Sequence, residues 1–177
     1  MRELYMQFAE ILDYPTPQLT QKVESCAAAL SAFDKDAVNL LQEFQQALRR
    51  HSRGELEEIY TSTFDLNGGC CLYAGHYIFG EDFRRSLLMV KLKELYRETG
   101  FSAAKELPDH LCVMLKFLAG AGDCEECEDL VADCMIPAIS AMIKSFKSKR
   151  HPYKTLLECL LRVLERQESK ATEANAD

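Results

Sequence analysis

Three cysteines in the second half of the chain could bind a metal ion or undergo redox chemistry. Cys124 and Cys127 form a C-x-x-C pair at a predicted helix start, and Cys134 follows on a neighbouring face. A structural zinc site needs four ligands, and Cys70 and Cys71 could complete one only if the fold brought their segment across. The carboxylates around the pair favour protonated thiols over the thiolates that redox chemistry requires. A cysteine-based metal-binding or redox protein is one hypothesis, and incidental thiols are the other.

A second group of residues could recognise a basic peptide. The motif Glu106-Leu107-Pro108-Asp109-His110 is predicted to open a helix, with its aspartate and histidine in the first turn. The helix dipole there favours the carboxylate and disfavours protonation of the imidazole. With Asp65 and the pair Glu81-Asp82, the acids of this motif could form an acidic mouth beside aromatic surface. Such a mouth suits a peptide with basic and apolar side chains, whereas a helix cap is the alternative interpretation.

Recognisable catalytic signatures are missing from the sequence. Its four histidines include no H-E-x-x-H pair, and there is no G-x-S-x-G elbow, Walker loop or G-x-G-x-x-G segment. We therefore predict that the protein is not an enzyme and carries no cofactor of its own. The net charge is -7, from 28 Asp and Glu against 21 Lys and Arg. This balance argues against a nucleic acid partner, because binding to phosphates favours a basic surface.

The segments that could direct the chain to a membrane or out of the cell are also missing. The N-terminus lacks the charged and apolar regions of a secretory signal. In the C-terminal half, the longest uncharged stretch lies between Asp133 and Lys144, well short of the ~20 residues that span a bilayer. We expect a cytoplasmic protein without stable membrane insertion, in which the eight cysteines are reduced and mostly buried.

The elements that must position these residues are helices, because apolar residues recur at helical spacing and no segment is typical of a strand. The spacing predicts a single all-α globule of seven or eight helices within residues 1–167, followed by a disordered polar tail over 168–177. The predicted helices cover 4–12, 18–32, 34–51, 53–63, 81–99, 107–120, 123–146 and 153–164. Asp34 is the expected N-cap of the third, and Pro137 is expected to kink or break the seventh.

Two details of this pattern bear on function. Residues 64–80 contain several glycines between aromatic residues, which predicts a long packed loop or short helical turns. The helix that follows is expected to end at Gly100 and to have one long apolar face. That expected buried face consists of Phe83, Leu87, Leu88, Leu92, Leu95 and Tyr96.

Several motifs, in order along the chain, resemble a known family. They are Y-T-S-T-F-D-L at 60–66, the glycine–cysteine segment leading into Y-I-F-G-E-D at 77–82, K-E-L-Y at 93–96, and the segment 106–119. The chain resembles the delta chain of respiratory nitrate reductase, within the NarJ, TorD and DmsD family of assembly chaperones for molybdenum enzymes. The likeness covers roughly residues 1–165. It departs at Asn67-Gly68-Gly69-Cys70-Cys71, where the family is expected to have a proline-containing segment.

The resemblance implies a TorD-like fold and a chaperone that is not a subunit of the finished enzyme. Such a system-specific chaperone binds the N-terminal segment of a molybdenum-enzyme catalytic subunit, here most closely the nitrate reductase alpha chain, until its cofactors are inserted. A helix-rich chain with a glycine-rich loop could also dimerise by exchanging helices. The residues that the resemblance assigns to the peptide site are Glu106, Pro108, Asp109 and His110, with Tyr60, Phe64 and Asp65 alongside.

Overall fold

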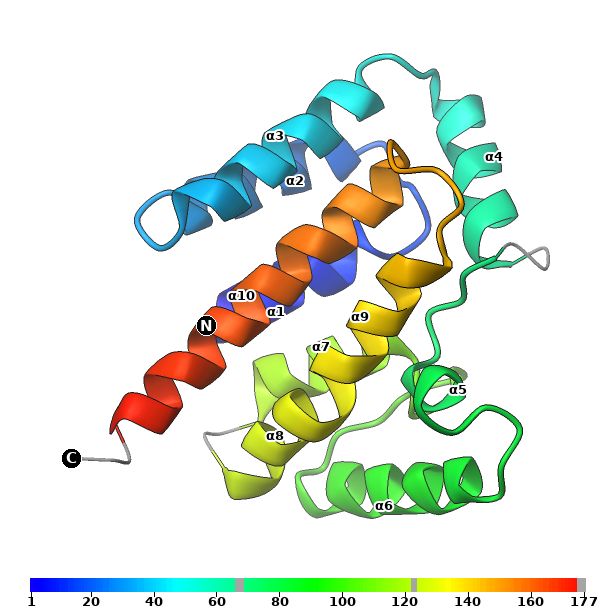
Figure 1. The fold of residues 1–177 in the computed structure, drawn as a ribbon, viewed down its shortest axis with the longest axis vertical. Coiled ribbons are helices and arrows are strands. Elements are labelled where there is room, and N and C mark those ends of the chain that lie inside the picture. The colour runs from blue at the N-terminus through cyan, green and yellow to red at the C-terminus, as the bar shows by residue number, and fades with distance from the viewer. Residues whose placement is uncertain (66–68, 122–123, 175–177) are drawn as a thin grey trace.

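Helices make up most of the computed structural model, which describes residues 1–65, 69–121 and 124–174 (Figure 1). Within these ranges there is no strand, and Tyr73 and His110 form an isolated antiparallel bridge. The predicted all-α class is therefore confirmed. The helices are α1 (Arg2–Ile11), α2 (Leu19–Leu30), α3 (Lys35–Leu48), α4 (Arg53–Phe64), α5 (Ala74–Phe79), α6 (Arg84–Glu98), α7 (Leu111–Gly120), α8 (Glu125–Asp129), the π-helix η1 (Leu130–Met135), α9 (Ile136–Ser145) and α10 (Pro152–Ala174).

The first and last helices organise the molecule. α1 packs against α2 and α7, whereas α10 packs against α3 and α9. The hydroxyl of Tyr5 in α1 donates to the side-chain oxygen of Gln167 in α10, which ties the two together. α6 lies apart from this centre, at the bottom edge of the view in Figure 1, and α5 connects it to α9.

The core follows the predicted helical spacing. In α10, buried side chains recur every three or four residues, which turns one face of the helix towards α3 and α9. The buried residues of that face are Tyr153, Leu156, Leu157, Cys159, Leu160, Val163 and Leu164.

Asp34 is the N-cap of α3, as predicted. Its carboxylate accepts hydrogen bonds from the backbone N–H groups of Asp36 (2.9 Å) and Ala37 (3.1 Å). It also accepts from Arg162 and Arg166 of α10, each at 2.9 Å. Burial of the carboxyl opposes its ionisation, but these hydrogen bonds outweigh burial and hold the pKa of Asp34 well below its ordinary value. One side chain therefore begins α3 and joins it to the last helix.

The predicted buried face of α6 is wrong at its N-terminal end. Leu92 and Tyr96 are buried, but Phe83 is 72% exposed and Leu87 is 54% exposed. No other described element covers that end of the helix, so an apolar stripe of α6 faces outward.

Two predicted helices also differ from the structure. α7 begins at Leu111, and His110 is its N-cap, so Asp109 precedes the helix instead of lying in its first turn. The predicted helix 123–146 is divided into α8, η1 and α9 without a gap. Pro137, in the first turn of α9, has no N–H for the carbonyl of Asp133, and its ring crowds that carbonyl. The wider π-helical turn accommodates both effects.

The C-terminal segment is helical further than predicted. α10 continues to Ala174, beyond residue 168, where the sequence predicts the start of a disordered tail. Asn67, Gly68 and the expected helix start at Asp123 lie outside the described residues. Among the described helices, none combines the length and the apolar character needed to cross a bilayer.

The Asp34 network predicts a specific acid sensitivity. Because the pKa of Asp34 is lower in the folded than in the unfolded chain, its contribution is complete above about pH 4 and is lost as the pH falls further. Asp34→Asn keeps a capping oxygen but removes the charge that the arginines bind. We expect the variant to be less stable than wild type at pH 7, by about 1–3 kcal/mol, and this difference to shrink at acidic pH. Urea denaturation of both proteins at pH 7 and below about pH 4 measures this difference in stability.

The matched control is Asp36→Asn, which removes a neighbouring but largely exposed carboxylate that also binds Arg162. Its effect should stay below about 1 kcal/mol, as is typical of surface ion pairs. Equal losses in the two variants would contradict a special role for the buried carboxylate.

Candidate functional site

The main chain of the 106–110 motif joins α7 to the segment that precedes α5. The N–H of Ala74 donates to the carbonyl of Asp109 (2.8 Å), and the N–H of Leu111 donates to the carbonyl of Leu72 (2.7 Å). These bonds flank the bridge between Tyr73 and His110. The motif therefore fixes the end of the glycine–cysteine segment against the start of α7.

The carboxylate of Asp109 is completely buried beneath α6. Its Oδ2 accepts a hydrogen bond from Nε of Arg85 at 2.9 Å, whereas Oδ1 is buried without a hydrogen-bond partner. A Cβ atom on Gly75 would lie 2.7 Å from Oδ2 and 3.0 Å from Cγ of Arg85, so only glycine leaves room for this pair. The expectation that Asp109 faces a bound peptide is therefore not met. It positions α6.

The other residues of the motif also make local contacts. Glu106 is exposed and accepts from the hydroxyl of Tyr73 at 3.1 Å and from the N–H of Leu107 at 2.9 Å. Pro108 is buried, and its carbonyl accepts from the hydroxyl of Tyr96 at 2.8 Å. Of the motif's side chains, those of Glu106 and Leu107 are exposed.

His110 caps α7 in its neutral form. Its Nδ1 accepts from the N–H of Cys112 at 3.3 Å, and its ring packs edge-on against Tyr73. Burial lowers the pKa of His110 below its ordinary value, although the carboxylates of Glu106, Asp13 and Asp109 act in the opposite direction. Protonation would remove the acceptor that the cap needs.

The predicted aromatic part of the site is mostly core. Tyr60 and Phe64 are buried, and both rings pack against Tyr153 of α10. Asp65, at the end of α4, is exposed. Burial raises the pKa of Tyr60, and the nearby Cys112 and Asp13 add to this shift.

The acidic mouth is not assembled as expected. Asp109 is buried, and Asp82 forms an ion pair with Arg84 at 3.1 Å, so neither carboxylate is free for a ligand. Glu106, Asp65 and Glu81 remain exposed.

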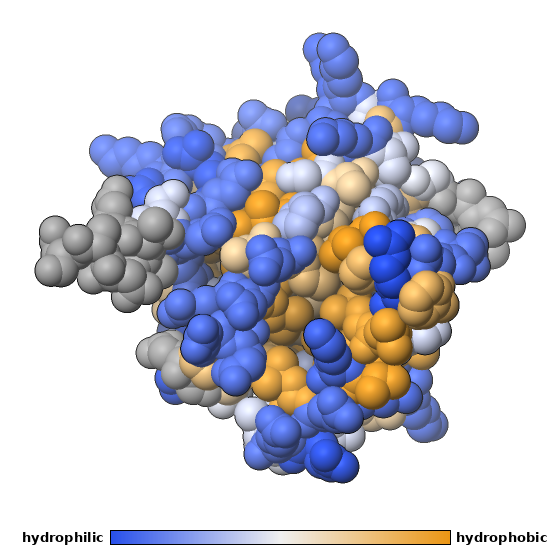
Figure 2. All heavy atoms as spheres, turned by 60° about the horizontal axis from the view of Figure 1, so that its bottom comes forward, coloured by the Kyte–Doolittle hydropathy of each residue, from blue (hydrophilic) through white to orange (hydrophobic). Residues whose placement is uncertain are grey.

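A groove of about 520 Å³ instead lies between α6 and the α8–η1 segment. Its apolar lining comes from α5, α6 and η1, and its rim is acidic, with Lys91 as the one cation among the lining residues. Figure 2 shows apolar surface in a hollow of this face, with hydrophilic side chains along its border. The apolar lining residues are Ile78, Phe79, Leu88, Leu92, Leu95, Leu130 and Cys134, and the acidic ones are Glu94, Glu98, Glu126, Asp129 and Asp133.

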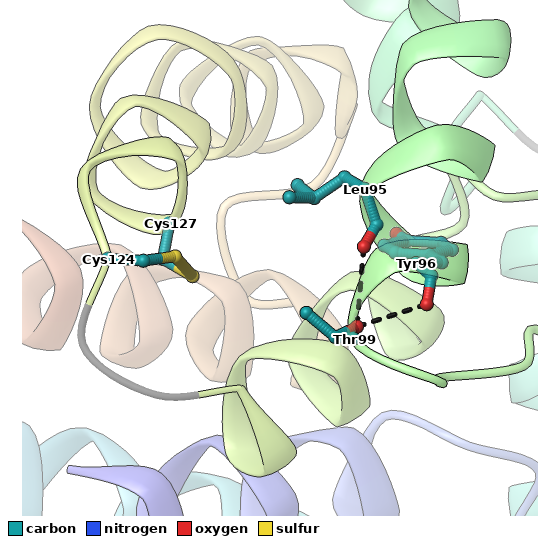
Figure 3. The surroundings of a disulfide bond; sticks show 5 residues. All are labelled: Leu95, Tyr96, Thr99, Cys124 and Cys127. Carbon is teal, nitrogen blue, oxygen red and sulfur yellow. Dashed lines mark hydrogen bonds between the residues drawn. A yellow bond between two sulfur atoms is a disulfide. The ribbon is translucent and has the colours of Figure 1, made fainter.

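A disulfide lies in the α8 wall of this groove. Cys124 and Cys127 are bonded to each other, which corrects the expectation that all the cysteines are reduced. The bond closes the first turn of α8, and Figure 3 shows it opposite Leu95 of α6. Cys134 is buried in η1, and burial raises the pKa of its thiol to about 12. It is therefore a poor thiolate ligand or nucleophile.

The surroundings of these cysteines do not support the metal-binding hypothesis. Cys124 and Cys127 are bonded to each other and are not separate ligands. Across residues 1–65, 69–121 and 124–174, the structure contains no group of three or more His, Cys, Asp or Glu side chains arranged to hold a metal ion.

The groove was missed in the sequence because its walls come from distant segments. The run Glu125-Glu126-Cys127-Glu128-Asp129 was an available signal, since it places several carboxylates on one short helix. Nothing local shows that α6 lies opposite this run.

Comparisons with known proteins agree with this fold. The family described as nitrate reductase delta subunit matches residues 29–149. The chain belongs to this family. Its relatives include the nitrate reductase molybdenum cofactor assembly chaperones NarJ of Bacillus subtilis (strain 168) and of Escherichia coli (strain K12). The first is 27% identical over 157 residues, covering 88% of this chain and 84% of that protein. The second is 25% identical over 159 residues, covering 88% of this chain and 66% of that protein.

A solved structure supports the fold of this delta-subunit family member. It is described as a redox enzyme maturation protein from Archaeoglobus fulgidus, and it superposes with a TM-score of 0.63 at 22% identity. The match covers 93% of this chain and 94% of the other. The TorD-like all-α fold is thereby confirmed.

Because the space around Gly75 is crowded, adding a single methyl group there should strongly reduce the stability of the fold. Gly75→Ala would push a methyl group into the Asp109–Arg85 ion pair. We expect it to lower the free energy of unfolding by about 1–3 kcal/mol. Gly54→Ala in α4 is the matched control, because a Cβ there meets nothing within 4 Å. It should be neutral or stabilising by up to about 1 kcal/mol. Similar losses in both variants would show that the ion pair does not require the glycine.

The lowered pKa of His110 predicts a second effect of pH on the stability of this delta-subunit family member. Because the pKa of His110 is lower in the folded than in the unfolded chain, stability should fall as the pH drops below about 6.5. His110→Asn retains a good N-cap acceptor but cannot titrate. We expect denaturation curves of the variant to change less between about pH 7.5 and pH 5 than those of wild type. Identical pH profiles would exclude this role.

Proposed function

We propose that this protein is an assembly chaperone of respiratory nitrate reductase. It binds the N-terminal segment of the catalytic alpha chain in the cytoplasm and holds the subunit while the molybdenum cofactor is inserted. It catalyses no reaction itself. Family membership supports the chaperone role, and the observation that carries the binding proposal is the apolar groove with an acidic rim between α6 and α8–η1.

The groove has the chemistry to bind an amphipathic basic segment. Apolar side chains of such a segment would displace water from Leu88, Leu95 and Leu130, and this burial supplies most of the affinity. Its basic residues would face the carboxylates of α8 and η1, of which Glu126 and Asp129 are exposed. Charge then determines the register of the segment and the encounter rate more than the affinity.

The residues assigned by the family motif act in two ways in this proposal. Asp109 and Pro108 lie beneath the surface and position α6, which forms one wall of the groove. Tyr60 and Phe64 are buried and pack against Tyr153 of α10, so in this proposal they stabilise the fold and do not contact the client. Glu106 and Asp65 are also exposed, and each carries a charge that a longer client segment could contact.

Calorimetric titration tests the proposal with a synthetic peptide that has the N-terminal sequence of the nitrate reductase alpha chain from the same genome. We expect wild type to bind it with a dissociation constant of about a micromolar. Leu95→Glu places a charge in the groove and should weaken binding at least about tenfold. Glu126→Lys/Asp129→Lys should weaken it and reduce its dependence on salt.

Glu43→Lys/Glu58→Lys is the matched control for the charge reversal, since it changes the net charge equally on the exposed surfaces of α3 and α4. It should leave binding nearly unchanged. Glu106→Lys/Asp65→Lys tests whether these two exposed carboxylates contribute to binding. If wild type fails to bind the peptide, or if the groove variants bind it as well as wild type, the proposed site is wrong.

A further inference from the structure

The disulfide between Cys124 and Cys127 has no part in the binding function proposed above, although it lies in the wall of the groove. It joins the N-cap residue of α8 to the third residue of that helix. Glu126 and Asp129, on either side of Cys127 in the sequence, both line the groove. The bond therefore constrains the turn that carries part of the acidic rim.

The start of α8 has few other constraints. The helix is five residues long, which is too short for a helix to be stable by itself. Among these five residues, all of which the structure describes, only Cys127 has a buried side chain. α8 packs mainly against η1, which directly continues it, and the side chain of Cys124 makes no capping hydrogen bond. The covalent bond is therefore the main constraint on this turn.

The two sulfur atoms differ in their access to solvent. Cys124 is half-buried and Cys127 is buried, so a thiol reagent reaches the sulfur of Cys124 first. All six other cysteines belong to the described residues, and Cys71 is the one among them that is not buried. Burial raises the thiol pKa of the remaining five and makes them poor partners in exchange. These five are Cys26, Cys70, Cys112, Cys134 and Cys159.

We propose that Cys124 and Cys127 form a reversible redox switch in the wall of the groove. Oxidation to the disulfide fixes the start of α8, and the groove then binds its client more tightly. Reduction to two thiols releases this turn and weakens binding. The inference rests on the proposed chaperone function, because it concerns the regulation of the same groove.

Reduction of the pair requires one dithiol and no other reactant. A thiolate of the dithiol attacks Sγ of Cys124, the bond to Cys127 breaks, and Cys127 leaves as a thiolate that takes up a proton. The second thiolate of the reductant then attacks the reductant's own sulfur in the mixed disulfide, which releases Cys124 to be protonated in turn. The chain gains two electrons and two protons, and the dithiol becomes a disulfide. Oxidation is the reverse reaction, with a small disulfide as the electron acceptor.

The effect on affinity follows from the order of the groove wall before the client binds. In the oxidised form the turn is fixed, and Leu95 of α6 lies opposite the bond (Figure 3). In the reduced form the start of α8 must be ordered when the client binds, and this loss of conformational entropy weakens the complex. A reducing compartment keeps such a pair as thiols. Oxidising conditions would therefore make the chaperone hold its client longer.

The first test measures hydrogen exchange without any client. Wild type with the disulfide formed is compared with wild type reduced by dithiothreitol, an uncharged dithiol that the carboxylates of α8 do not repel. The N–H groups of Cys127 and Glu128 donate to the carbonyl of Cys124, and they should exchange at least about tenfold faster after reduction. Amides of α2, which packs against α1 and α3, should exchange at the same rate in both forms.

The second test repeats the calorimetric titration with the alpha-chain peptide in both redox states. The oxidised form should bind at least about threefold more tightly than the reduced form. Cys124→Ala removes the disulfide without removing a capping hydrogen bond, so it should bind like reduced wild type with or without dithiothreitol. Cys71→Ser removes the other accessible thiol and is the matched control. It should respond to dithiothreitol as wild type does.

The outcomes separate this inference from the chaperone function. If both redox forms bind the peptide equally tightly, the groove binds its client but the switch is wrong. If neither form binds it, the proposed function is wrong, and regulation of client binding is overturned with it. Equal exchange rates in α8, or a bond that dithiothreitol does not reduce in the folded protein, also overturn the switch. A response that disappears in Cys71→Ser would assign the effect to that cysteine instead.

Discussion

The arrangement of α5, α6 and the start of α7 depends on the ion pair between Asp109 and Arg85. A carboxylate without access to water is unfavourable unless a cation is bound to it, and removing one partner of such a pair typically costs about 3–5 kcal/mol. Here the carboxylate comes from the segment before α7 and the guanidinium from the first turn of α6. The pair therefore holds α6 in position, although one side of this helix is apolar and uncovered. By fixing α6, the ion pair also maintains the gap between α6 and the α8–η1 segment, and this gap is the groove.

Features that depend on nearby residues were predictable from the sequence. The N-cap at Asp34 was correct, because a capping carboxylate needs only the backbone N–H groups that follow it. The end of α6 at Gly100 was also correct, since its positive φ of 71° favours glycine. Pro137 was expected to disturb its helix, and the structure shows the form that the disturbance takes, a π-helical stretch without a break.

Features that depend on distant residues were not predictable in the same way. Helical spacing indicates which side of α6 is apolar, but it does not show whether another element covers Phe83 and Leu87. The motif around Asp109 was located correctly, yet its charge was assigned to a ligand because Arg85 is far away in the sequence. The disulfide was unexpected for a different reason: the acidic neighbours describe the reactivity of the thiols, whereas the bond depends on the closeness of Cys124 and Cys127 in one turn.

Gly75 connects this packing to the evolution of the chain. Any side chain at that position would collide with the carboxylate of Asp109 and the stem of Arg85. Substitutions at the three positions should therefore be coupled. A larger residue can replace Gly75 only in a chain where Asp109 or Arg85 has already been replaced. A relative with alanine or serine at this position should also lack the aspartate or the arginine. This coupled substitution would distinguish relatives that hold α6 by the ion pair from those that hold it by other contacts.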